Sequence, residues 1–235
     1  MILIVCAIKR EIEPFLKALK NASIEKCGAL KVHHGTINGV KVTVVRCGVG
    51  LEKAAASTQT LINSYKIAHM IMSGTAGGVD SKLKIGDTIV SEELLYHEGT
   101  TKLMQIDSSF NKDTPFKADE NLLLSMKKAI ENTPPPQAVH FGRITSGSKF
   151  VTGKTFKAVA EKFNPLCVDM ETAAVAHVCA INNIPFIAVR SITDTPEKSG
   201  ILNFYKNVVF AANSSYMVVE NLVKELDRDN PEHLS

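Results

Sequence analysis

The sequence predicts one α/β domain over residues 1–235, a three-layer sandwich with helices on both faces of a central mixed, twisted β-sheet. Short apolar runs typical of buried strands alternate with segments of helical spacing. A hairpin signal interrupts this alternation early, which favours a mixed sheet over a purely parallel one. Hydrophobic residues make up 45% of the chain and charged residues 22%, the balance of a globular protein with one large core.

The first half of the chain contains the hairpin and several strands. Residues 2–8 form a continuous apolar run, as expected of a strand covered on both faces. Residues 11–19 have helical spacing, and the runs at 32–37 and 40–46 flank an Asn-Gly pair that favours a tight hairpin turn. The further expectations are an alanine-rich helix after 48–50, a strand at 70–72 ending in a glycine-rich turn at 73–78, and a strand at 86–91.

The second half alternates more regularly. Residues 99–118 have weak periodicity and are predicted to form an irregular excursion. The helix expected at 121–130 is stopped by three consecutive prolines at 134–136. The other expected elements are strands at 139–144, 166–168 and 186–191, helices at 171–180 and 204–226, and a polar, frayed tail at 227–235.

Charge and hydropathy argue against nucleic acid and membrane partners. The formal net charge is only +3, and the lysines are spread along the chain instead of forming a basic cluster. No apolar run is long enough to span a bilayer. The N-terminal apolar run is short, and Lys9 and Arg10 follow it, so it is interpreted as a buried strand and not as a signal peptide.

Cysteine and histidine spacing predicts a cytoplasmic protein without a metal site. The five cysteines are odd in number and have no CxxC spacing, which favours reduced thiols in the core. The seven histidines show no HExxH or other ligand spacing.

Acidic residues follow three of the apolar runs. Glu11 comes after the first strand, Asp169 and Glu171 after the strand at 166–168, and Asp194 after the strand at 186–191. Each acid alone could simply cap a helix or a turn. A carboxylate at a strand end could instead hold a vicinal diol, or donate a proton if desolvation keeps it protonated.

Two glycine-rich segments are candidate ligand contacts. Residues 73–78 contain three glycines and two hydroxyl residues, which would let the backbone approach a flat ligand. Residues 48–50 form a GxG that fails the dinucleotide fingerprint, because Lys53 stands where the third glycine belongs. That segment is either a tight turn or a close approach to a sugar or an anion.

In this order along the chain, the acids and the glycine-rich segment resemble the nucleoside phosphorylase/nucleosidase superfamily, and within it the methylthioadenosine/S-adenosylhomocysteine nucleosidases. The resemblance covers nearly the whole chain, and the last two segments together are the most specific. The segments that carry it are Ala7–Glu11, Gly48–Gly50, Ser73–Gly78, Gly86–Asp87, Ser146–Phe150, Val168–Glu171, His177–Cys179 and Pro185–Asp194.

The resemblance implies a nucleoside phosphorylase-like fold and a role for each site residue. Glu11 corresponds to the acid that orients and deprotonates the attacking water, and Asp194 to the acid that protonates purine N7. Met170 and Glu171 correspond to the ribose contacts, and Phe150 to the residue that stacks on the base. The remaining expected contacts are Val151 at the purine edge, Thr75 and Ala76 in the sugar–base region, Gly77 and Asp169 at the substrate, and Ile8, Val49 and Phe204 around the 5′ substituent.

The implied reaction is hydrolysis of methylthioadenosine, S-adenosylhomocysteine or a related 5′-modified adenosine, with release of adenine. Breaking the glycosidic bond develops positive charge on the ribosyl ring and negative charge on the purine. One acid protonates the leaving base and another activates water, the logic of an inverting glycosidase. The resemblance also implies a homodimer with a small-molecule nucleoside as its substrate and with no metal or organic cofactor.

Water is preferred over phosphate as the nucleophile. Met72 stands where phosphorylases of this superfamily place an arginine, and residues 8–11 replace their glycine-rich phosphate loop with a segment ending in an acid. The alternative, in which Arg10 or Arg46 binds phosphate, would make the protein a phosphorylase.

Two further alternatives stay open, a futalosine hydrolase of the same fold and a non-catalytic nucleoside-binding protein. The chain departs from the nucleosidase pattern at residues 97–101, at Ser148 and at Asp169. Those departures concern the 5′ substituent, the subunit interface and the geometry of the site.

Overall fold

The computed structural model describes residues 1–98, 114–152, 154–198 and 200–228. Its strands are β1 (Ile2–Cys6), β2 (Lys20–Cys27), β3 (Leu30–Ile37), β4 (Val40–Arg46), β5 (His69–Gly78), β6 (Thr88–Tyr96), β7 (Phe116–Lys117), β8 (Val139–Ser146), β9 (Cys167–Asp169) and β10 (Phe186–Asp194). Its helices are α1 (Lys9–Ala18), α2 (Leu51–Ser64), α3 (Glu120–Asn132), α4 (Lys154–Phe163), α5 (Thr172–Ile181) and α6 (Ile201–Arg228).

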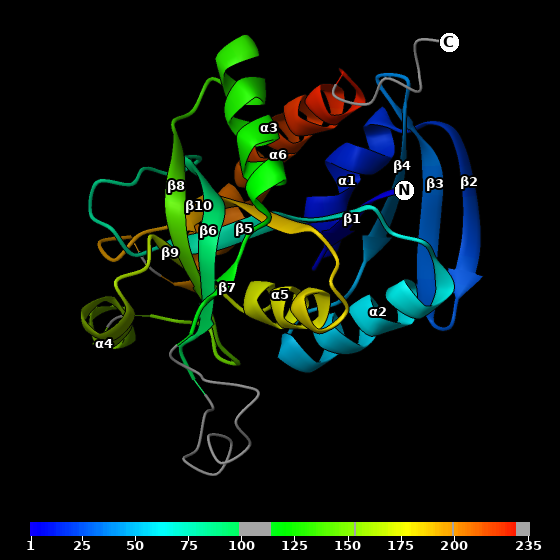
Figure 1. The fold of residues 1–235 in the computed structure, drawn as a ribbon. Coiled ribbons are helices and arrows are strands. Elements are labelled where there is room, and N and C mark those ends of the chain that lie inside the picture. Colours follow the sequence, from blue (N-terminus) through cyan, green and yellow to red (C-terminus); the bar gives the residue numbers. More distant parts are fainter. Residues whose placement is uncertain (99–113, 153, 199, 229–235) are drawn as a thin grey trace.

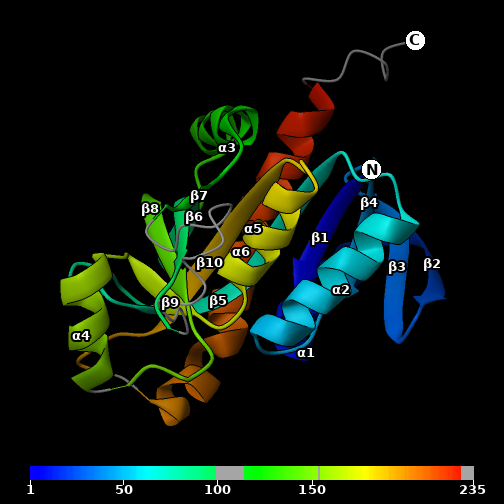
Figure 2. The same ribbon diagram turned by 60° about the horizontal axis from the view of Figure 1, so that its bottom comes forward.

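Helices cover both faces of the sheet, so the predicted three-layer sandwich is confirmed (Figures 1 and 2). Helices α1, α3 and α6 enclose one buried apolar cluster, which includes Phe15 and Val219. Helices α2 and α5 enclose the other, which includes Leu61 and Val175. Consecutive residues of β1 alternate between the two clusters, because successive side chains of a strand point to opposite faces.

The sheet is mixed, as predicted, and its strand order is β10-β6-β8-β9-β5-β1-β4-β3-β2. The strands β1, β5 and β10 are parallel to one another, whereas β9 is antiparallel to β5 and β6 is antiparallel to β10. Because β10 also pairs with β5, the five strands β5, β9, β8, β6 and β10 close into a ring. The carboxyl ends of β1, β5 and β10 therefore meet at one edge of the sheet.

The hairpin between β3 and β4 is confirmed at its turn. Asn38 and Gly39 have φ angles of 51° and 88°, the left-handed conformation that a tight hairpin turn of this kind requires. All five cysteines are free and buried, as expected. Within the described residues, no helix combines the length and apolar character needed to cross a membrane.

The segment at 73–78 is part of strand β5, and the expected glycine-rich turn is wrong. Residues 73–77 pair with β10 over the range from Val189 to Asp194, and Gly78 pairs with Cys167 of β9, so the strand continues to its last glycine. Glycine is needed inside the strand at position 74, where a Cβ atom would lie 2.1 Å from Nη1 of Arg190. The glycines thus make room for side chains that pack against the strand.

Three elements were not predicted from the sequence, namely β2, α4 and, within the expected excursion at 99–118, β7. Strand β2 is exposed along nearly its whole length, so it has no apolar run to detect. Helix α4 packs against a small cluster separate from both main ones. Residues 99–113 lie outside the described part of the chain. The last helix extends to Arg228, beyond the expected start of the tail, and 229–235 again lie outside the described residues.

Candidate active site

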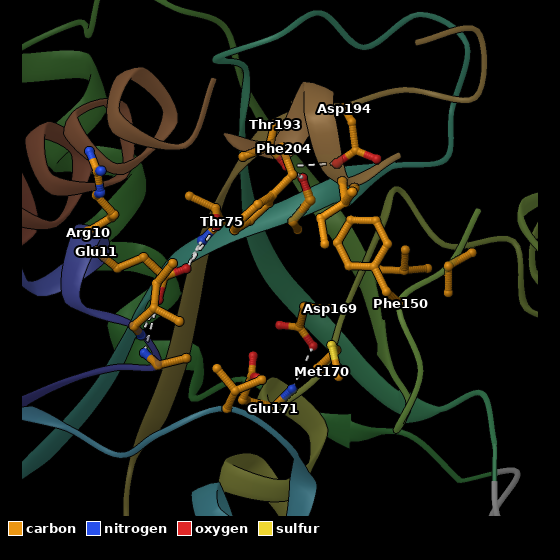
Figure 3. A pocket seen from close by; sticks show the side chains of 18 of the residues that line it. Arg10, Glu11, Thr75, Phe150, Asp169, Met170, Glu171, Thr193, Asp194 and Phe204 are labelled. Atoms are coloured by element: carbon orange, nitrogen blue, oxygen red, sulfur yellow. Dashed lines mark hydrogen bonds between the residues drawn. The ribbon is translucent and has the colours of Figure 1, made fainter. Parts of the chain in front are cut away.

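Every residue predicted for the site lines one cavity of about 390 Å³ at the carboxyl ends of β1, β5 and β10, beside the end of β9 (Figure 3). This size falls within the range of small-molecule sites. The predicted residues in its wall are Ile8, Glu11, Val49, Thr75, Ala76, Gly77, Phe150, Val151, Asp169, Met170, Glu171, Asp194 and Phe204. The wall also includes Ala7, Lys9, Arg10, Lys149, Val168, Thr193, Ile201 and Tyr205.

Glu11 is buried in the first turn of α1, and its carboxylate is fixed by four hydrogen bonds. Its Oε2 accepts from the backbone amides of Ala7 at 3.0 Å and Ile8 at 3.1 Å. Its Oε1 accepts from the backbone amide and the hydroxyl of Thr75, both at 2.8 Å. Only 3% of the residue is exposed. The carboxylate is thus held against β5, where it can accept a further hydrogen bond from a bound molecule.

Asp194 ends β10 at another side of the same cavity and is nearly free of stabilising contacts (Figure 3). Its Oδ1 accepts from the Thr193 hydroxyl at 2.8 Å, but its Oδ2 has no hydrogen-bond partner within the described residues. Burial raises the pKa of Asp194, although the Thr193 hydroxyl and the nearby Gly200 amide lower it in part. A buried carboxyl with an unused oxygen and a raised pKa suits a proton donor.

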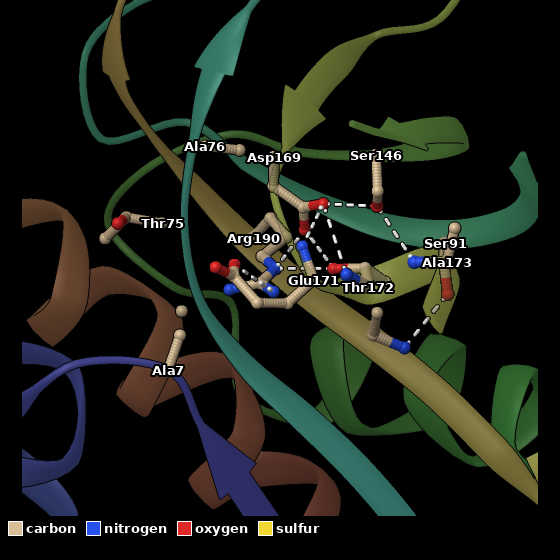
Figure 4. A network of polar contacts seen from close by, with 12 residues as sticks. Ala7, Thr75, Ala76, Ser91, Ser146, Asp169, Glu171, Thr172, Ala173 and Arg190 are labelled. Carbon is tan, nitrogen blue, oxygen red and sulfur yellow. Dashed lines mark hydrogen bonds and ion pairs between the residues drawn. The ribbon is translucent and has the colours of Figure 1, made fainter. Parts of the chain in front are cut away.

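Arg190 connects three carboxylates beneath the cavity floor (Figure 4). The side chain is fully buried on β10. Its Nε lies 2.8 Å from Oδ2 of Asp169, its Nη1 3.9 Å from Oε1 of Glu11, and its Nη2 3.7 Å from Oε2 of Glu171. Neither Nη1 nor Nη2 has a hydrogen-bond partner within the described residues. The guanidinium therefore neutralises part of a negative cluster and keeps donors free beside two of its acids.

Both carboxylate oxygens of Asp169 are already bound by neighbouring groups of the protein. Its Oδ1 accepts from the Ser146 hydroxyl and, at 3.2 Å each, from the backbone amides of Glu171 and Thr172. Its Oδ2 accepts from the Thr172 hydroxyl and faces Arg190. Asp169 lines the cavity, yet these contacts occupy both oxygens, which points to holding Arg190 in place.

Glu171 stands at the start of α5 with one oxygen tied to the backbone. Its Oε1 accepts from the amide of Gly50 at 2.9 Å, so the GxG segment does approach an anion, the carboxylate of another residue. Burial raises the pKa of Glu171 to about 7, and Asp169 and Glu11 act in the same direction while Arg190 opposes them. Its second oxygen remains available near the cavity.

Aromatic and aliphatic side chains form the opposite wall of the cavity. Phe150 is 41% exposed, and its ring lies 6.0 Å from that of Phe204 in an edge-to-face arrangement. Val151 is buried beside it. Figure 3 shows Phe150 between the sides occupied by Asp194 and Met170. A flat base could therefore stack at this wall within reach of Asp194.

A family comparison agrees with this geometry. The model of the phosphorylase superfamily matches residues 1–224. The chain belongs to the phosphorylase superfamily. The predicted family and the predicted class of enzyme, an N-glycosyl hydrolase, are both confirmed.

Solved structures of superfamily members share the whole fold. A Borrelia burgdorferi protein assigned as a 5′-methylthioadenosine/S-adenosylhomocysteine nucleosidase and bound to adenine is 34% identical, with 95% of this chain and 99% of that chain covered and a TM-score of 0.87. The Colwellia psychrerythraea nucleosidase of the same name, in complex with adenine, is 27% identical, with 96% and 95% covered and a TM-score of 0.87. The futalosine hydrolase of Helicobacter pylori is 24% identical, with 95% and 97% covered and a TM-score of 0.85, which is a likeness of fold.

The acids that line this cavity were predicted from the sequence, and the buried arginine beside them was not. Arg190 was part of the segment that carried the resemblance, but it received no role. Its only signal in the sequence is a charged residue inside an otherwise apolar and small-residue strand, four positions before Asp194. Among the described residues, no group of histidine, cysteine and acidic side chains is arranged to hold a metal ion.

Proposed function

We propose that this protein hydrolyses the N-glycosidic bond of 5′-methylthioadenosine, S-adenosylhomocysteine or a related 5′-modified adenosine and releases adenine. The observation that carries the proposal is that Glu11 and Asp194 line one cavity, the first as a hydrogen-bond acceptor and the second as a carboxyl suited to donate a proton. Glu11 is anchored as a hydrogen-bond acceptor, and burial raises the pKa of Asp194. Base-catalysed attack by water and acid-catalysed departure of a purine require one group of each kind.

The proposed mechanism begins with the nucleoside bound between these acids. The base stacks on Phe150, where protonated Asp194 donates its proton to N7 as the bond to C1′ breaks. Glu11 accepts a proton from water, which then attacks C1′. The free Nη1 donor of Arg190, 3.9 Å from Oε1 of Glu11, supports a water position between these two groups. Glu171 and Met170 hold the ribose, and the raised pKa of Glu171 reflects its burial there.

Water is favoured over phosphate because Arg190, the buried cation beside Glu11, is already surrounded by carboxylates. Arg190 is shared among Glu11, Asp169 and Glu171, and a phosphate dianion beside it would meet all three acids. Arg46 is exposed and is absent from the cavity wall. Arg10 lines the cavity, but Figure 3 shows its side chain directed away from the carboxylate of Glu11.

The adenine part of the proposal draws on the adenine-bound superfamily members described above. The 5′ part rests on the apolar wall formed by Ile8, Val49 and Phe204. We also propose a homodimer, which the family resemblance implies, and analytical ultracentrifugation of the full chain tests it directly. A monomer at all concentrations would contradict that part alone.

One assay panel tests the activity. The protein is incubated with methylthioadenosine, S-adenosylhomocysteine, adenosine, inosine and futalosine, with and without phosphate, and free base and sugar product are quantified. We expect adenine and free 5′-modified ribose, at rates independent of phosphate. A sugar 1-phosphate would identify a phosphorylase, release of hypoxanthine from futalosine would identify the second hydrolase, and binding without release would identify a binding protein.

A further inference from the structure

We propose that Glu98 is a positioning residue that fastens the turn carrying Phe150 and thereby sets the base-binding wall of the cavity. For the identity of the ligand, this proposal rests on the function proposed above. The contacts that support it do not involve the catalytic acids. The turn at issue is residues 147–149, which connects the end of β8 to Phe150.

Glu98 binds this turn through one carboxylate oxygen. Its Oε2 accepts from the hydroxyl of Ser148 at 2.6 Å and from the backbone amide of Ser148 at 3.0 Å. The Ser148 hydroxyl and amide, together with His97 and Lys149, outweigh the small effect of burial and lower the pKa of Glu98. The acceptor is therefore ionised at neutral pH, the state in which hydrogen bonds of this kind are strongest.

His97, the residue before Glu98, contacts the same turn. The amide of His97 donates to the backbone oxygen of Ser146 at 2.9 Å, which extends the pairing of β6 with β8. The imidazole of His97 packs so closely under Gly147 that a Cβ atom there would lie 2.2 Å from its Nε2. The turn thus packs against the imidazole of His97 and is hydrogen-bonded to Glu98. These are the two residues that follow β6.

The fastened turn leads directly into the cavity wall. Phe150 and Val151 follow Ser148 by two and three residues, and both line the cavity. Phe150 is 41% exposed, and its ring contacts that of Phe204 edge to face. Without Glu98, the residues before Phe150 lose two charge-assisted hydrogen bonds, and the aromatic wall must be ordered when a base binds. The cost falls on binding and not on the chemical step, because neither Glu11 nor Asp194 contacts this turn.

The test compares kcat and KM for methylthioadenosine hydrolysis, and calorimetric binding of adenine, in the full chain and four variants. Glu98→Ala removes the acceptor, Ser148→Ala removes only the hydroxyl, and the third variant combines both. Glu131→Ala, an exposed acid on α3 without a contact to the cavity, is the matched control. We expect Glu98→Ala to raise KM and the dissociation constant of adenine roughly threefold to tenfold, with kcat within about twofold of the wild type.

The coupling between the two residues supplies the second readout. Ser148→Ala should show a smaller rise in KM, and the combined variant should be no worse than Glu98→Ala, because both changes remove the same contact. Wild-type KM and adenine binding in Glu98→Ala, or an equal loss of kcat in place of the KM effect, would overturn the positioning role while leaving the proposed function intact. A wild-type protein that neither releases nor binds adenine would instead overturn the proposed function, and with it the base wall.

Discussion

Thr75 donates two hydrogen bonds to Oε1 of Glu11, one from its backbone amide and one from its hydroxyl, each with a length of 2.8 Å. The other oxygen of Glu11 accepts from two amides at the end of β1, at Ala7 and Ile8. One carboxylate thereby bridges two adjacent parallel strands. Its orientation is set by the fold before any substrate binds, which is the arrangement that favours catalysis by a positioned group.

The Thr75 hydroxyl should therefore matter for rate more than for binding. Thr75→Val keeps the shape and the backbone hydrogen bond but removes the hydroxyl donor from Glu11. We expect kcat to fall about tenfold with KM little changed, since a charge-assisted hydrogen bond is lost. Thr75→Ser, which restores a hydroxyl, is the control and should recover most of the rate. Equal rates in the Val and wild-type proteins would show that the amides alone hold Glu11.

The proton donor should be indispensable while its removal leaves the cavity intact. Asp194→Asn keeps the size of the side chain and removes the transferable proton, so we expect kcat to fall by about 10²–10⁴-fold. Adenine binding, measured by calorimetry, should remain within about tenfold of the wild type. Full turnover of an adenine nucleoside by this variant would mean that another group protonates the base.

The same substitution should raise stability at neutral pH. Because the folded-state pKa of Asp194 is raised, the native protein binds the proton more tightly than the unfolded chain, and stability falls as pH rises through the interval between the two pKa values. In Asp194→Asn no carboxyl ionises at this position, so this loss of stability is absent. Its melting temperature should exceed that of the wild type at about pH 8, and the difference should shrink as the pH approaches about 4. A difference that is constant with pH would contradict this assignment.

Substrate affinity should depend on pH through Glu171, whose pKa is raised to about 7. In the proposed complex the ionised carboxylate accepts hydrogen bonds from two ribose hydroxyls, and protonation weakens this interaction because it removes the charge and part of the acceptor capacity. We expect KM for the nucleoside to rise as the pH falls below about 7, whereas adenine, which lacks ribose, should bind without this dependence. Glu171→Gln should have a high KM that no longer varies with pH. A pH-dependent KM in that variant would assign the titration to another group.

Arg190 should be essential for folding as well as for the site. Arg190→Met leaves Asp169, Glu11 and Glu171 without their buried counter-charge, so we expect a loss of about 3–5 kcal/mol in the free energy of unfolding. Arg228→Met is the matched control, because Arg228 is exposed and, within the described part of the chain, pairs only with Glu225, at 3.2 Å. The control should cost about 0–1 kcal/mol. Urea unfolding measures both, and similar small losses would show that the cluster does not depend on Arg190.

Sequence patterns located the catalytic candidates because each lies where an apolar strand ends. Glu11 and Asp194 each follow such a run within three residues, and the resemblance to a known superfamily supplied their roles. The same reasoning gave no role to Arg190, because a buried arginine looks like any other charged residue until its partners are known. It also placed a turn at 73–78, since glycines usually interrupt strands and nothing local shows the side chains that fill the space beside them.

The sequence by itself determined the alternation of strands and helices, the hairpin at Asn38 and the candidate residues that line the cavity. Local periodicity and turn chemistry act over a few residues, so they can be read along the chain. Only the tertiary structure decided that β10 pairs with β5 as well as β6, which closes the ring and brings Arg190 beneath Glu11, Asp169 and Glu171. That pairing joins segments more than a hundred residues apart, and its stability comes from burial and hydrogen bonding that exist only once the sheet has formed.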